Sequence, residues 1–218
     1  MELFKPNIAK LSKNGDTRRL VGLLGHPKVA SEASAALVKI GRPSFEHLVA
    51  ALQGTDKVVC AGAVLVLQRA ALLDEVDGVT LNRLLADNSL DPLCRIPIAE
   101  SLARQGDAAA ISQLIGFLRY AKLDSLREQF ASTSSQIKKM NEYDPATSAQ
   151  LSVIAERQAR LITMMETKHK LVKMEIVAAL VRVGTPTVGP LMKAAKSPHP
   201  DTQTVAAAAL AMMGQPIG

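Results

Sequence analysis

Aromatic residues are scarce in this sequence. It has no Trp, two Tyr and four Phe among 218 residues, although 48% of its residues are hydrophobic. The faces of β-sheets favour aromatic and β-branched side chains, whereas the Ala, Leu and Val that dominate here suit the close packing of helices. A chain of this length is long enough to bury a substantial core. The composition therefore predicts an all-α protein.

Cysteine and long apolar runs are also scarce. Cys60 and Cys94 are the only cysteines, and both lie in apolar helical pattern, which predicts reduced, buried thiols rather than disulfides. The most apolar run, residues 58–73, is interrupted by Gln68 and Arg69, whereas a membrane span needs about twenty apolar residues. The N-terminal sequence MELFKPNIAKLSKNGD lacks the apolar core and the cleavage site of a signal peptide. We expect a cytoplasmic protein without a membrane segment.

The motifs of common active sites are missing as well. The sequence contains no glycine-rich phosphate loop, HExxH, CxxC or GxSxG, and its four His residues lie in separate turns or helices, away from Cys or Asp at metal-ligand spacing. Asp74, Glu75 and Asp77 form an acidic cluster, which we interpret as a solvated helix-capping turn rather than a cation site. We expect no catalytic residue, no metal site and no cofactor, and we leave an enzymatic activity open.

Five segments end an apolar helical pattern in the same way. Four of them close on Gly, in KIGRP, RQGDA, RVGTP and MMGQP, and a weaker copy closes on Ala. Leu stands four positions before each closing residue, which predicts that this Leu is buried and that a closing Gly, which alone does so without strain, takes a left-handed cap past the last turn. The leucines are Leu37, Leu67, Leu102, Leu180 and Leu210, and the closing residues are Gly41, Ala71, Gly106, Gly184 and Gly214.

A second apolar helix follows the closing positions, as in SFEHLVAAL and AAAISQLIGFL. The closing positions are 30, 35, 78 and 30 residues apart. Periods of about 30 to 35 residues with two amphipathic helices each are typical of an α-solenoid. We therefore predict one α-solenoid domain over residues 1–218, built from about five helix pairs whose second helices line a concave face.

One of these units, CRIPIAESLARQGDAAAISQL (residues 94–114), resembles the short HEAT-like repeats of the bilin-lyase type, whose pattern is V-R-x-x-A-x-x-A-L-G-x-I-G-D-x-x-A-V-x-x-L. The resemblance covers nearly the whole chain outside residues 120–170. It implies an α-solenoid but no single function, because such repeats occur in scaffolds, assembly factors, bilin lyases, DNA glycosylases and iron hydroxylases. The hydroxylases use His-Glu dipeptides, whereas Glu46-His47 has the reverse order here, and the glycosylases use aromatic residues, which are scarce here.

Residues 120–170 interrupt the fourth repeat with a segment that is charged and free of Gly. Two rows with alternating steps of 3 and 4 residues, as in a coiled coil, run through it and are separated by NEYDP, which breaks the helix before Pro145. The rows are Leu123, Leu126, Phe130, Thr133, Ile137 and Met140, and then Leu151, Ile154, Gln158, Leu161 and Met165.

These rows predict an antiparallel coiled-coil hairpin over residues 123–168, whose arms project on the order of 30 Å at 1.5 Å per residue. Its first arm is expected to continue a helix that begins near Ala108, and the fold-back places Ile137 opposite Leu151, Leu126 near Leu161 or Ile162, and Leu123 near Met165. We interpret the hairpin as an interaction arm, with a passive spacer as the alternative. Its tip carries the candidate partner-binding residues Lys138, Lys139, Glu142 and Tyr143.

The net charge of +6 is concentrated in the N-terminal repeat and along the hairpin. Binding of nucleic acid through phosphates is therefore a second hypothesis, although no aromatic residue interleaves the basic ones and a solvated surface is the favoured interpretation.

The preferred function is a non-catalytic protein-binding scaffold or adaptor that uses the solenoid face and the hairpin. Its partner would be another protein, or a second copy bound through the hairpin. The candidate residues of the solenoid face are Glu32, Arg95 and Glu100. The alternatives are a nucleic-acid-binding HEAT-like protein, or a lyase-like enzyme or assembly factor of the bilin-lyase type.

Overall fold

The computed structural model describes residues 6–117, 121–140 and 145–216. Every regular element in these ranges is helical, so the prediction of an all-α protein is confirmed. The α-helices are α1 (Ile8–Lys13), α2 (Thr17–Gly22), α3 (Ala30–Ile40), α4 (Phe45–Leu52), α5 (Lys57–Arg69), α6 (Gly78–Ala86), α7 (Pro92–Arg104), α8 (Ala108–Gly116), α9 (Ala121–Met140), α10 (Pro145–Val183), α11 (Val188–Ala194) and α12 (Pro200–Met212). Short 3-10 helices lie between them: η1 (Leu23–Gly25), η2 (Arg42–Ser44), η3 (Leu73–Glu75) and η4 (Thr185–Thr187).

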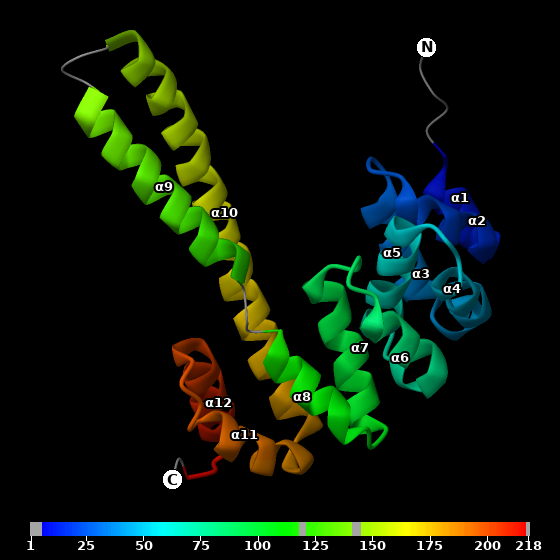
Figure 1. Cartoon of the computed structure of the whole chain (residues 1–218). Coiled ribbons are helices and arrows are strands. Elements are labelled where there is room, and N and C mark those ends of the chain that lie inside the picture. The colour runs from blue at the N-terminus through cyan, green and yellow to red at the C-terminus, as the bar shows by residue number, and fades with distance from the viewer. Residues whose placement is uncertain (1–5, 118–120, 141–144, 217–218) are drawn as a thin grey trace.

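The helices pack in the order of the chain, from α1 and α2 at one end of the body to α11 and α12 at the other (Figure 1). One row of neighbours consists of α3, α5, α7, the C-terminal part of α10, and α12. The shorter helices pack against this row, with α4 on α5, α6 and α8 on α7, and α11 on α12. A single apolar core therefore extends from Ile8 in α1 to Leu210 in α12.

Aspartate side chains start many of these helices. Their carboxylates accept hydrogen bonds from backbone N–H groups of the first turn, at donor–acceptor distances of 2.8 to 3.2 Å. Such caps satisfy N–H groups that have no partner inside the helix, so the turns fix where each helix begins. The capping residues are Asp16, Asp56, Asp77, Asp91 and Asp107.

The five predicted closing residues all have positive φ angles, including the one that is not glycine. Ala71 has a φ of 56°, while the four glycines have φ angles between 68° and 98°. The leucines four positions earlier are buried, with exposed fractions of 2% or less. The register predicted for the five helix ends is therefore confirmed.

The closing residues nevertheless fall into two geometries. At Ala71, Gly106 and Gly214 the next residue donates its N–H to the carbonyl oxygen of the buried Leu, at 2.8 to 2.9 Å, which is the Schellman motif of a left-handed cap. At Gly41 and Gly184 the ψ angles are −133° and −140°, outside the left-handed helical region, and the glycine itself donates to that Leu. The prediction of a left-handed cap is thus wrong for these two, each of which is followed by a 3-10 helix with Pro at its start.

A further helix end of the same kind precedes the five. Gly15 has a φ of 65°, and Asp16 donates its N–H to the carbonyl of Leu11 at 3.0 Å, as in the Schellman motif. Leu11 also stands four positions before the closing residue, in the sequence LSKNG. The α1–α2 pair therefore repeats the local pattern, and the sequence analysis missed it because α1 is only 6 residues long.

The inserted segment forms α9 and the first part of α10, which contact each other and extend away from the body (Figure 1). We call α9 together with residues 145–168 of α10 the arm. The prediction of a helix continuing from Ala108 into the arm is wrong, because α8 ends at Gly116 and Phe117 is its C-cap. On the return side, α10 begins at Pro145 as predicted and runs without a break for 39 residues into the core.

The predicted row is confirmed at Leu151, Gln158 and Met165 and is wrong by one residue at Ile154 and Leu161. Ile154 and Leu161 are 46% and 48% exposed, whereas their neighbours Ala155 and Ile162 are half-buried. The less exposed series continues in steps of 3 and 4 residues from the arm into the core through residues 148, 151, 155, 158, 162, 165, 169, 172 and 176. One continuous face of a single helix therefore packs against α9 in the arm and against other helices in the body.

Only some of the contacts predicted across the arm involve side chains that the structure describes. Ile137 and Leu151 are both half-buried, on helices that contact each other. The side chains of Leu123, Leu126 and Met140 lie outside the described part of the structure. The pairing of individual residues therefore stays a prediction.

The two thiols are buried and free, as predicted from their apolar surroundings. Desolvation by burial raises the pKa of Cys94 to about 11 and also raises the pKa of Cys60. Among the described helices, none is both long and apolar enough to cross a membrane.

Candidate functional site

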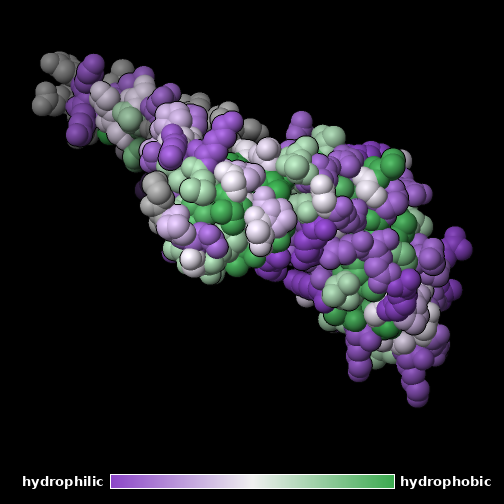
Figure 2. Space-filling model, turned by 90° about the horizontal axis from the view of Figure 1, so that it is seen from below, coloured by the Kyte–Doolittle hydropathy of each residue, from purple (hydrophilic) through white to green (hydrophobic). Residues whose placement is uncertain are grey.

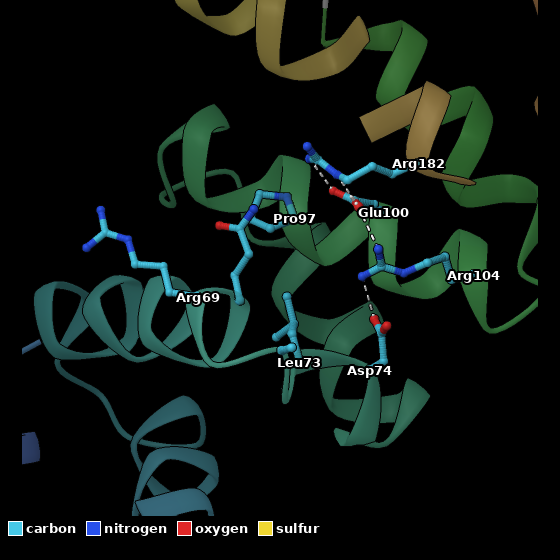
Figure 3. A pocket seen from close by; sticks show the side chains of 9 residues that line it. Arg69, Leu73, Asp74, Pro97, Glu100, Arg104 and Arg182 are labelled. Atoms are coloured by element: carbon cyan, nitrogen blue, oxygen red, sulfur yellow. Dashed lines mark hydrogen bonds and ion pairs between the residues drawn. The ribbon is translucent and has the colours of Figure 1, made fainter. Parts of the chain in front are cut away.

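A cavity of about 450 Å³ opens at the C-terminal ends of α5, α7 and α10 (Figure 3). Residues from the turn after α5 complete its wall. The lining residues are Gln68, Arg69, Ala71, Leu73, Asp74, Pro97, Glu100, Arg104 and Arg182. The lining residues come from α5, α7, α10 and the turn after α5, so this hollow does not test which helices line a concave face.

The repeat pattern explains why three arginines gather here. Arg69, Arg104 and Arg182 each stand two positions before a closing residue, so equivalent ends of neighbouring helices present equivalent side chains. Lys39 occupies the same position before Gly41. Cations in the last turn also interact favourably with the negative end of a helix dipole. These arginines were not predicted as site residues, although their recurrence at one position of the repeat is visible in the sequence.

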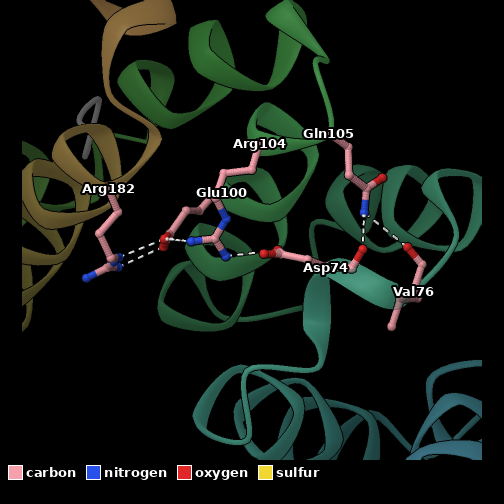
Figure 4. A network of polar contacts seen from close by, with 6 residues as sticks. All are labelled: Asp74, Val76, Glu100, Arg104, Gln105 and Arg182. Carbon is pink, nitrogen blue, oxygen red and sulfur yellow. Dashed lines mark hydrogen bonds and ion pairs between the residues drawn. The ribbon is translucent and has the colours of Figure 1, made fainter.

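Glu100 is the centre of a polar network in the wall (Figure 4). Its side chain is 3% exposed, and its Oε1 accepts hydrogen bonds from Nε of Arg182 and Nη1 of Arg104, both at 2.7 Å. Its Oε2 accepts a third hydrogen bond, from Nη2 of Arg182, at 2.7 Å. A buried carboxylate is costly unless it is paired, and the paired arrangement of two guanidinium groups supplies that pairing. Glu100 therefore joins α7 to α10.

Other carboxylates hold the same two arginines from their outer sides. Nη2 of Arg104 donates to Asp74 at 2.8 Å, and Nη2 of Arg182 donates to Glu175 at 2.8 Å. Hydrogen bonds from Arg182 to Glu100 are the main reason that the pKa of Arg182 is raised above its ordinary value. Both guanidinium groups are therefore held in position from two sides.

The turn after α5 is tied to the end of α7 by a second polar contact. Nε2 of Gln105 donates to the backbone carbonyl oxygens of Asp74 and Val76, both at 3.1 Å (Figure 4). These bonds satisfy carbonyl groups in η3 and the residue that follows it, which have no helix to pair with. The side of the cavity that contains Asp74 and Arg104 is consequently well braced.

The opposite side of the cavity has unused hydrogen-bonding groups. Arg69 and Gln68 form no hydrogen bond or ion pair with any residue that the structure describes. In Figure 3 Arg69 stands on the far side of Leu73 and Pro97 from Arg104 and Arg182, with its guanidinium group turned away from Glu100. The site thus combines a fixed ionic wall with a free cation at its rim.

The acidic cluster after α5 acts in capping and ion pairing. Asp77 accepts a hydrogen bond from the backbone N–H of Thr80 at 2.8 Å, and this bond lowers its pKa. Asp74 pairs with Arg104, and Glu75 pairs with Arg42. Across the described residues, no group of His, Cys, Asp and Glu side chains is arranged to hold a metal ion.

The three residues predicted for a solenoid face are separated by the structure. Glu100 lines the cavity, but the other two do not. Glu32 is exposed in the first turn of α3. Arg95 donates from Nε and Nη2 to the carbonyl oxygen of Leu85 at 3.0 and 2.8 Å, and its guanidinium group lies 4.8 Å from the centre of the Phe117 ring. Desolvation lowers the pKa of Arg95, which caps the end of α6.

The predicted tip residues are described only in part. Lys138 and Lys139 are exposed near the end of α9. Glu142 and Tyr143 lie outside the described residues.

Helix α10 also exposes a row of large apolar side chains, two of which, Ile154 and Leu161, were predicted to lie in the interior of the arm. Ile154, Leu161, Met164 and Leu171, which we call the α10 row, are 46%, 48%, 68% and 51% exposed. Their spacing of 7, 3 and 7 residues places them on one side of α10. Elsewhere, Figure 2 shows hydrophilic residues across the middle of the body, with apolar residues in separate patches.

Comparison with known proteins adds no family to this description. No protein-family model matches the chain, and no curated protein matches it at a significant level.

Proposed function

We propose that this protein is a non-catalytic scaffold that binds another protein along the arm. The observation that carries the proposal is the α10 row, because large apolar side chains spaced by heptad steps form the kind of surface that receives an amphipathic helix. Exposed apolar surface of this kind is costly in water unless a partner covers it.

The position of the row favours this use. Lys168 belongs to the same series of positions as Leu161, Met164 and Leu171, and its ammonium group pairs with Asp91 at the start of α7. The Leu171 end of the row therefore lies where α10 contacts the body, and the row continues along the arm to Ile154. A partner helix lying on it would approach both the arm and the N-terminal end of α7.

The charges around the row favour an acidic partner. Arg160 is exposed beside it. Glu156 is the acidic neighbour of Arg160, at 3.9 Å, an exposed pair that contributes little. Arg157 also stands in the row itself, between Ile154 and Leu161, where a like-charged partner would be repelled. A second copy bound in antiparallel register would set Arg157 against Lys168, so a different protein is the better fit.

The wider architecture belongs to this proposal. We infer that the body is a HEAT-like α-solenoid and that the arm is an antiparallel coiled-coil hairpin. The recurring Leu and closing residue at the helix ends support the first inference, and the continuous 3–4 series on α10 supports the second.

Site-specific photo-cross-linking tests the proposal. A photoreactive amino acid is placed at Met164 in the row or, as a matched control, at Thr163, which is exposed on another side of the same helix. Both variants are incubated in extract of the native cells. We expect a discrete cross-linked protein from position 164 only, competed by excess wild-type chain and not by a Leu161→Glu variant. Light scattering of the purified chain identifies self-association.

Equal cross-linking from both positions, or equal competition by Leu161→Glu, would contradict binding along the row. A purified chain that is dimeric and cross-links only to itself would replace the heterologous partner with a second copy.

A further inference from the structure

We infer that the cavity at the ends of α5, α7 and α10 binds an acidic segment of the partner protein, with a carboxylate held by Arg69. The inference rests on the proposed function, because it assigns a second contact to the same partner. It starts from the unequal use of the three guanidinium groups that line the cavity.

Arg104 and Arg182 already have structural roles. Together they donate five hydrogen bonds of 2.7 to 2.8 Å, to Glu100, Asp74 and Glu175. A ligand carboxylate at these groups would have to displace a protein carboxylate, and displacing Glu100 would leave a buried charge without its partners. These two arginines are therefore part of the wall.

Arg69 has no such structural role. It stands at the C-terminal end of α5, yet it donates to no carbonyl oxygen of the last turn and pairs with no described carboxylate. Arg104 and Arg182 are paired with Glu100, Asp74 and Glu175, so Arg69 supplies the one guanidinium charge of the lining that has no carboxylate partner among the described residues. A single carboxylate matches that one charge. A doubly charged phosphate would exceed it and would lie close to Glu100 and Asp74.

The remaining lining groups fit a peptide. The side-chain amide of Gln68 has both a free donor and a free acceptor, which are the complements of a backbone peptide group. Ala71, Leu73 and Pro97 supply apolar atoms against which the methylene groups of a Glu side chain can pack. The cavity volume of about 450 Å³ is within the usual range of about 300 to 1,000 Å³ for ligand pockets.

NMR titration of the full chain tests the inference directly. The probes are acetyl-Leu-Glu-Leu-amide and the matched neutral peptide acetyl-Leu-Gln-Leu-amide, and the readout is the side-chain Nε–H resonance of Arg69. We expect the Glu peptide to shift this resonance with a Kd near the millimolar range, and to bind about tenfold more tightly than the Gln peptide.

Variants identify the residue responsible. Arg69→Gln is expected to abolish the difference between the two peptides, while Arg18→Gln, which removes an exposed arginine of α2 outside the cavity, leaves it unchanged. Backbone amide spectra confirm that both variants are folded. Because Arg69 forms no hydrogen bond or ion pair with other described residues, its replacement is not expected to disturb the network around Glu100.

Three results would overturn the inference: no shift up to about 10 mM of the Glu peptide, equal binding of both peptides, or full binding by Arg69→Gln. Inorganic phosphate that shifts Arg69 at least as strongly as the Glu peptide would overturn the choice of a carboxylate. Cross-linking at Met164 is independent of these measurements, so the scaffold proposal survives if only the cavity fails.

Discussion

Replacing Ala71 by Gly should stabilise this protein, although such a change usually weakens a helical protein. Ala71 has a φ of 56°, a conformation that costs an L-residue roughly 1 to 2 kcal/mol relative to Gly. Gly in turn lowers stability by about 0.4 to 1 kcal/mol, because the unfolded chain gains conformational freedom. The side chain of Ala71 is exposed, so removal of its methyl group opens no cavity. The net expectation is a gain of about 0 to 1.6 kcal/mol, centred on about 0.8 kcal/mol.

Unfolding by urea and by heat, followed by far-UV circular dichroism, measures this gain. For a chain of this size, about 1 kcal/mol corresponds to a rise in Tm of about 2 to 4 °C. Gly106→Ala is the matched reversal, since Gly106 has a φ of 98° and an added Cβ would meet nothing within 4 Å. It should lower stability through the backbone alone. A lower Tm for Ala71→Gly, together with an unchanged Tm for Gly106→Ala, would refute the argument from φ.

Three further outcomes follow from burial and charge. Leu102→Ala should cost about 2 to 5 kcal/mol in the free energy of unfolding, because Leu102 is 2% exposed, whereas Leu161→Ala on the arm should stay within about 0.5 kcal/mol. Cys94, whose pKa is raised to about 11, should react with iodoacetamide at pH 8 more than about a hundredfold more slowly in the folded chain than in urea, as followed by mass spectrometry. The folded pKa of Asp87 is lowered by a hydrogen bond from Lys57, and that of Asp77 by its bond from Thr80. The stability that these two carboxylates contribute is present above their unfolded pKa of about 4 and is lost as pH falls toward their folded pKa values. The Tm of the wild-type chain should therefore decline below about pH 4, and the Tm of Asp87→Asn should decline less steeply.

The helix ends could be predicted from sequence because their determinants are local. A buried Leu and a closing residue four positions later lie within one turn and its cap, and both are set by backbone geometry. The burial of Leu67 was predicted in the same way, but the positive φ of Ala71 was not, because the predicted cap applied to glycine alone. The predicted left-handed cap was wrong at Gly41 and Gly184. Each is followed by a 3-10 helix with Pro at its start, and the ψ angle of the glycine lies outside the left-handed helical region.

The phase of the arm could not be settled from sequence. Ile154 is next to Ala155, and Leu161 is next to Ile162. Two rows that share residues 151, 158 and 165, and that take either 154 and 161 or 155 and 162, therefore fit the same 3–4 spacing. Packing against α9 and the body decides between them, and that information is tertiary. Of Ile154 and Ala155, the larger side chain is the exposed one. Leu161 and Ile162 are of equal size, so side-chain size does not indicate which of the two is buried.

The cavity could not be predicted from the sequence, because the residues of its wall are far apart along the chain. Arg182 and Glu100 are 82 residues apart in sequence, with the whole arm between them, so no local pattern pairs them. The recurrence of a basic residue two positions before the closing residue was a local signal, but by itself it indicates only a favourable helix end.

The unbroken helix α10 makes the arm a lever. At 1.5 Å per residue, its 39 residues are about 58 Å long, and about 36 Å of that length lies in the arm. A tilt of about 5° at the point where α10 enters the body would displace the far end of the arm by about 3 Å, because the helix has no break to absorb the rotation. Glu100 and Arg182 clamp the inner end of this lever to α7. Because about 36 Å of the helix lies in the arm and about 21 Å lies between residue 168 and Arg182, a displacement at that clamp would move the far end of the arm by about 1.7 times as much.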